Sequence, residues 1–172
     1  MAKVKTNFGI IDKIKGLEKS SGATKKLGTA IEKTMKDHIS KGISPVKGER
    51  KFASYAVDRD GDPKKYPTGY KKGKKPINLY LSGKMLSYLT HWTKRKKNSL
   101  SLIIGIHPNA PGDVVDRAEA HNDGTLVKNN VPKRKFIPNK QGDKFNVTIT
   151  RLIKNLLSDE INKTIKKSNK KS

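Results

Sequence analysis

Hydrophobic positions recur at helical spacing in two long stretches of the chain. Within residues 23–40 the apolar stripe is Leu27, Ala30, Ile31, Met35 and Ile39, and Gly42 follows as a stop signal. From about residue 146 a second stripe comprises Ile149, Leu152, Ile153, Leu156, Leu157, Ile161 and Ile165. Two long amphipathic helices are therefore expected, packed against each other along these stripes.

The middle of the chain changes to strand-like alternation. Residues 92–97 and 100–106 flank Asn98-Ser99, and the apolar positions of the second arm alternate at Leu100, Leu102, Ile104 and Ile106. This pattern predicts an antiparallel hairpin. Just before it, Ser82 is a suitable N-cap for a short helix with apolar positions Met85, Leu86 and Leu89.

A third helix is predicted from about residue 113 to Gly124. Its apolar face would be Val114, Val115, Ala118 and His121, and its polar face Asp116, Glu119, Asn122 and Asp123. Gly124 stands where a helix C-cap needs a positive φ. After a polar loop, Pro132 and Pro138 bracket Lys133-Arg134-Lys135-Phe136-Ile137, which we expect to be extended.

The remaining segments read as loops and tails. Glycines and prolines punctuate residues 43–76, which predicts a long basic loop, while residues 1–21 form a basic N-terminal segment and residues 163–172 a basic tail. The sequence thus predicts an α+β fold in a single domain, residues 1–172. Its small antiparallel sheet would pack against the two long amphipathic helices. No apolar run is long enough to span a bilayer, and no secretory signal is expected.

The net charge of the chain predicts that it associates with an anionic partner. The 172 residues carry 39 Lys and Arg against 15 Asp and Glu, a formal net charge of +24, and only six of the basic residues are arginine. Residues 63–112 contain ten lysines, one arginine and no acid. The candidate basic surface is Lys71, Lys72, Lys74, Lys75, Lys94, Arg95, Lys96 and Lys97. Lysine-rich surfaces suit diffuse attraction to nucleic acid or an acidic protein face. Lysines that protect an edge strand from aggregation are the alternative.

The sequence offers no catalytic set. There is no cysteine, no phosphate-binding loop and no nucleophile elbow. Asp58, Asp60 and Asp62 resemble the start of a calcium loop, but Pro63 and Gly69 occupy positions that need glycine and glutamate. His121-Asn122-Asp123 looks superficially like part of a metal-nuclease box, although the other ligands are missing. We expect no cofactor, no metal and no enzymatic activity.

Two segments carry a resemblance to a known family. Ala120-His121-Asn122-Asp123-Gly124-Thr125, followed by Val131-Pro132-Lys133-Arg134-Lys135-Phe136-Ile137-Pro138, resembles the paired boxes Ala-x-His/Glu-x-x-Gly and Pro-x-Arg-Pro-Phe-Leu. These boxes are typical of the virion-morphogenesis and tail-completion proteins of tailed phages. Lys135 replaces the second proline and Ile137 the leucine. Upstream, residues 75–86 (KPINLYLSGKML) are similar to a further segment of that family.

The resemblance implies a structural protein of the virion, made in the host cytoplasm and located at the neck or tail. It would act as a tail-completion or head–tail connector subunit, in a homo-oligomeric ring such as a hexamer that joins neighbouring connector or tail proteins. The basic surface could also touch packaged DNA. The resemblance assigns subunit contacts to His121, Gly124, Arg134, Phe136, Ile137, Asn78, Leu81 and Met85. A lysine-rich protein that binds nucleic acid without sequence specificity is the alternative function.

Overall fold

The computed structural model describes residues 21–52, 79, 84–96, 99–124 and 133–169. Its elements run in the order α1 (Ser21–Ser40), α2 (Lys84–Ser87), β1 (Leu89–Lys96), β2 (Ser99–Ile106), α3 (Gly112–Asp123) and α4 (Val147–Asn169). The fold is α+β, with β1 and β2 paired as a two-stranded antiparallel sheet. The two long helices and the hairpin are where the hydrophobic pattern predicts them.

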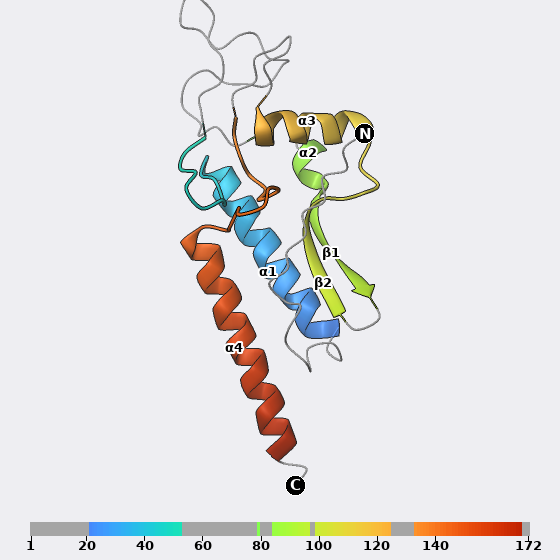
Figure 1. Cartoon of the computed structure of the whole chain (residues 1–172), viewed down its shortest axis with the longest axis vertical. Coiled ribbons are helices and arrows are strands. Elements are labelled where there is room, and N and C mark those ends of the chain that lie inside the picture. The colour runs from blue at the N-terminus through green and yellow to red at the C-terminus, as the bar shows by residue number, and fades with distance from the viewer. Residues whose placement is uncertain (1–20, 53–78, 80–83, 97–98, 125–132, 170–172) are drawn as a thin grey trace, which may run out of the picture.

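Helix α1 lies between the sheet and α4 (Figure 1). Its buried stripe of Leu27, Ile31, Met35 and Ile39 faces Leu102 and Ile104 of β2 and Ile149 and Ile153 of α4 in a continuous core. The predicted contact between the two long helices is therefore present. The sheet packs on the opposite side of α1 from α4, so the long helices do not form one layer beneath the sheet.

A polar contact fixes α1 against β1. Glu32 Oε2 lies 2.7 Å from His91 Nδ1 and accepts a hydrogen bond from the Thr90 hydroxyl at 3.3 Å. The His91 ring lies directly over Gly28, where an added Cβ would come within 2.2 Å of His91 Cδ2. Burial opposes the charge on Glu32, but hydrogen bonds from Lys36 and His91 outweigh it and lower the pKa of this carboxyl.

The hairpin starts three residues before the predicted arm. Leu89 pairs with Ile106 and Trp92 with Ile103, and Leu89 is fully buried. The expectation that Leu89 belongs to the preceding helix is wrong, because α2 ends at Ser87 and the apolar Leu89 side chain extends the sheet's core face. The predicted cap Ser82 and the turn residue Asn98 lie outside the described residues.

Helix α4 begins as predicted and ends later. Asn146 Oδ1 accepts a hydrogen bond from the Ile149 N–H at 3.1 Å, which caps the helix. The helix continues to Asn169, so the expectation that the chain is already a frayed tail from residue 163 is wrong for 163–169. Its apolar stripe is buried at Ile149 and Ile153, whereas Ile161 is 39% exposed. Figure 1 shows this part of α4 extending beyond the start of α1.

The first part of the predicted long loop is a turn built into the core. Ser44, Pro45, Val46 and Phe52 are buried, and Val46 forms a β-bridge with Phe145. A second bridge joins Ile43 to Lys51. The remainder of that predicted loop, residues 53–76, lies outside the described residues, as do Asn78 and Leu81.

Candidate functional site

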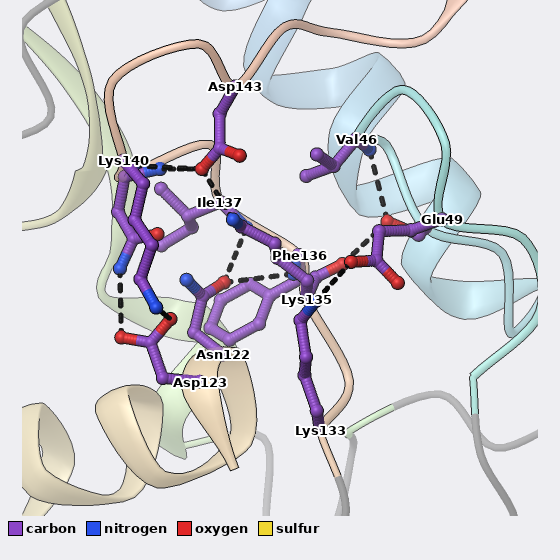
Figure 2. A network of polar contacts seen from close by, with 12 residues as sticks. Val46, Glu49, Asn122, Asp123, Lys133, Lys135, Phe136, Ile137, Lys140 and Asp143 are labelled. Carbon is purple, nitrogen blue, oxygen red and sulfur yellow. Dashed lines mark hydrogen bonds and ion pairs between the residues drawn. The ribbon is translucent and has the colours of Figure 1, made fainter.

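The end of α3 and the extended residues 133–138, here called the strip, form one hydrogen-bonded junction. The Asn122 Oδ1 atom accepts hydrogen bonds from the backbone N–H groups of Phe136 (3.0 Å) and Ile137 (2.8 Å). The Arg134 N–H donates to the His121 carbonyl at 2.6 Å. Figure 2 shows the Asn122 amide pointing from α3 at the strip backbone. The two segments that carry the family resemblance thus meet in space.

The geometry at Gly124 explains why the helix stops at the junction. Gly124 ends α3 with φ 76° and ψ 158°. This region is essentially restricted to glycine, because a Cβ would clash with the backbone. The predicted role of Gly124 as the stop of this helix is therefore confirmed.

The opposite side of the strip is held by the turn formed by residues 43–52. The Ser44 hydroxyl donates to the Lys135 carbonyl at 2.5 Å, and the same oxygen accepts from the Val46 N–H at 3.0 Å. Lys133 forms an ion pair with Glu49 at the strip's exposed edge (Figure 2). The strip is therefore fixed between α3 and this turn, through backbone groups on both sides.

Lys135 is a buried cation with a carboxylate partner. Its side chain is 6% exposed, and its Nζ lies 2.5 Å from Asp143 Oδ2. Asp143 also accepts hydrogen bonds from the N–H groups of Asn139 and Lys140. Burial opposes the charge on Asp143, but the bonds from Lys135 and from the backbone of Lys140 outweigh it and lower the pKa of the carboxyl. The buried charge of Lys135 is thus compensated.

His121 and Arg134 meet through their side chains as well. Arg134 Nη1 lies 3.4 Å from His121 Nδ1. Because a guanidinium can only donate, Nδ1 must be the acceptor and the imidazole is neutral, with its proton on Nε2. Burial, reinforced by the charges of Arg134 and Arg117, lowers the pKa of His121 to about 4. A histidine in this state is a poor choice for a proton-transferring group near neutral pH.

Four of the eight expected subunit-contact residues lie inside the chain's own core. Phe136 is 0% exposed, and Arg134, Ile137 and Met85 are also buried. A buried side chain has no surface to offer a neighbour, so these four residues can act in a subunit contact only by shaping the surface around them, and that role stays a prediction. His121 and Gly124 are partly exposed.

Asn122 is the residue of the junction that the sequence pattern misplaced. Helical periodicity assigned it to the polar face of α3, whereas it is 3% exposed. The strip covers Asn122 at the end of that face, so the amide is needed to satisfy two backbone donors that would otherwise be buried without partners. The sequence carries one signal for this role: an asparagine near a helix end has a short side chain whose oxygen can accept hydrogen bonds from nearby backbone N–H groups.

The basic candidates are only partly described. Lys94 is exposed in β1, and Arg95 and Lys96 pair with Leu100 and Ser99 at the end of the hairpin. Lys71, Lys72, Lys74, Lys75 and Lys97 lie outside the described residues. The three basic candidates that the structure describes therefore lie at the turn end of the hairpin.

Helix α3 contains more carboxylates than any other helix or strand of the described chain. It carries four carboxylates and one arginine, and it lies at one end of the described chain (Figure 1). The opposite end combines the start of α1, the turn end of the hairpin and the last part of α4 (Figure 1). Each of these contributes exposed lysines, including Lys25, Lys26, Lys94 and Lys166.

Within the described ranges, no three His, Asp or Glu side chains gather as a metal site, and no helix is long and apolar enough to cross a membrane. The chain matches no protein-family model, no curated protein and no solved structure.

Proposed function

We propose that this protein is a structural subunit of a tailed-phage particle, acting at the head–tail junction or at the tail end through protein–protein contacts. The observation that carries the proposal is the α3–strip junction. The resembling boxes provide its parts: the turn of helix with His121 and Asn122, the stop at Gly124, and the strip with Phe136 and Ile137.

The second resembling segment supports the same proposal. Met85, which lies in it, and Leu79 are both buried in the core that Phe136 and Ile137 complete. The upstream segment and the strip, which both carry the family resemblance, therefore contribute side chains to the same core. Such packing is expected if the resemblance reflects a shared fold.

The polar groups of the junction favour a structural role over catalysis. The Asn122 oxygen, the Ser44 hydroxyl and the Asp143 carboxylate each bond backbone donors or acceptors of the strip and its continuation. His121 is held neutral against Arg134. In this arrangement the polar side chains maintain a backbone conformation and present no nucleophile–base pair.

Electron microscopy of particles made without this gene tests the proposal. We expect filled heads together with separate tails, and infectious particles restored by supplying the wild-type gene from a plasmid. Unjoined tails of normal length would indicate a joining role, and abnormally long tails a terminating role. Normal infectious particles from the deletion genome would contradict the proposal.

A sequence-independent nucleic-acid-binding protein is the second candidate function. The exposed Lys25, Lys26 and Lys94 favour it, because no carboxylate in the described part of the chain forms an ion pair with them. Binding to random duplex DNA should weaken with salt at a slope of roughly −0.9 per phosphate contacted. Weak binding at about 150 mM salt would count against this function, since lysine–phosphate attraction is its basis.

A further inference from the structure

The outer face of α3 is acidic in a protein whose total charge is strongly positive. Asp116 is exposed and Glu119 half-buried, and neither has an ion-pair partner among the described residues. Asp113 at the helix start is shared between Lys84 at 3.0 Å and Arg117 at 4.0 Å. Helix α3 thus keeps two carboxylates without an ion pair beside Asp113, while the net charge is +24, and these three residues are named here the acidic face.

The opposite end of the molecule carries the matching surface. Lys25 and Lys26 begin α1, Lys94 approaches the hairpin turn, and Lys166 lies in the last part of α4. We call these four residues the basic end. None of the four has an ion-pair partner within the described chain. Ile161, 39% exposed on the same part of α4, adds uncovered apolar area to it.

We infer that the acidic face of one copy binds the basic end of a second copy, in a head-to-tail contact. This inference rests on the proposed function, because it names the contact through which the subunits assemble. The two surfaces lie at opposite ends of the long axis (Figure 1). Joining acidic face to acidic face, or basic end to basic end, would place like charges together, whereas joining one to the other places opposite charges together.

A pair joined head to tail still has one free acidic face and one free basic end, so further copies can bind in the same way. Such a contact closes into a ring when the rotation between neighbours permits, and otherwise forms a filament. Exposed ion pairs are individually weak and are screened by salt. Charge would therefore set the orientation and the rate of association, while apolar area around Ile161 would contribute affinity.

Charge reversal on each surface separately tests the contact with the full-length protein. One variant combines Asp116→Lys with Glu119→Lys, and the other combines Lys25→Glu with Lys26→Glu. Molar mass would be measured by light scattering below about 0.1 M salt. We expect wild-type protein to form assemblies larger than dimers and each variant alone to be monomeric, with unchanged circular dichroism.

Mixing the two variants supplies the decisive comparison. The reversed acidic face of the first matches the reversed basic end of the second, and their unaltered surfaces also match. Equal amounts should therefore restore assemblies that alternate the two variants. The control Lys47→Glu/Lys144→Glu changes the net charge as much as the α1 variant does, at exposed positions on neither surface, and should assemble like wild type.

Several results would overturn the inference. These are wild-type protein that stays monomeric or stops at dimers, assembly by either variant alone, or failure of the mixture. Retained assembly with lost duplex binding in the Lys25/Lys26 variant would assign the basic end to DNA instead. If the head-to-tail contact is disproved, the gene-deletion experiment still tests the proposed function. Particle morphology does not depend on which surfaces join the subunits.

Discussion

The side-chain oxygen of Asn122 lies 2.8 Å from the backbone nitrogen of Ile137, fifteen residues further along the chain. The same oxygen accepts from Phe136 at 3.0 Å. One amide thus replaces the partner strand that the extended strip lacks at this point. The last turn of α3 and the strip are joined by this residue, so their relative position depends on it.

Replacing Asn122 with alanine should destabilise the protein by about 2–4 kcal/mol, because two buried N–H groups lose their acceptor. Asn155→Ala, at an exposed position in α4, is the matched control and should change stability by less than about 0.5 kcal/mol. Urea denaturation followed by circular dichroism measures both. Equal stability of the two variants would show that the Asn122 bonds contribute nothing to the fold.

Replacing Phe136 with alanine should cost about 3–5 kcal/mol, because its ring is completely buried. The result expected is loss of folding or a strongly lowered melting temperature, and not a folded monomer that has lost only its ability to assemble. Phe136→Leu should retain much of the stability, since it fills most of the space. A fully stable Phe136→Ala monomer would contradict the position of this ring in the core.

Two glycines of α1 should respond to alanine in opposite ways. At Gly28 the new methyl group would overlap the His91 ring, which Glu32 holds in place, so we expect a loss of about 1–3 kcal/mol. At Gly22 nothing lies within 4 Å, and alanine should stabilise the helix by up to about 1 kcal/mol. Thermal melting compares them. Adding His91→Ala to Gly28→Ala should remove the overlap, so additive losses would argue against it.

Stability should fall as the pH is lowered from about 6.5 towards 4. The folded chain holds His121 neutral down to about pH 4, whereas the unfolded chain protonates it near 6.5. The unfolded state therefore binds more protons in this window, and the free energy of unfolding should decrease by up to about 3 kcal/mol. In His121→Gln this pH dependence should be smaller, as measured by urea denaturation at several pH values. An identical slope in the variant would show that another group causes it.

The periodic segments could be predicted from sequence because each follows its own apolar pattern. Leu27, Ile31 and Met35 face the core as their spacing requires, and Gly124 stops α3 where a positive φ is needed. The start of β1 was missed because Leu89 fits both a helical and an alternating pattern. Its pairing with Ile106, a tertiary contact, decides between them.

The junction itself could not be predicted, because the charged strip reads as exposed. Arg134 is 2% and Lys135 5% exposed, although such side chains usually lie in solvent. Asp143 forms an ion pair with the buried Lys135 ammonium, and Ser44, from a turn far away in the sequence, donates to the Lys135 carbonyl. Local spacing carries no information on such partners. The segments that carry the family resemblance meet at this junction, where Arg134, Phe136 and Ile137 are buried in the core.

The bonds of Ser44 set the order in which the protein can be completed during synthesis. Its hydroxyl donates to the carbonyl of Lys135, 91 residues later in the chain, and its own carbonyl accepts from the side chain of Asn146, 102 residues later. Contacts so distant in sequence form slowly, because a long loop must close first. While the chain emerges from the ribosome, α1 therefore has its sheet partner long before the strip and α4 can cover its other side. Until residue 146 and the helix after it have left the ribosome, the growing chain exposes the side of α1 that α4 will cover to chaperones and to aggregation.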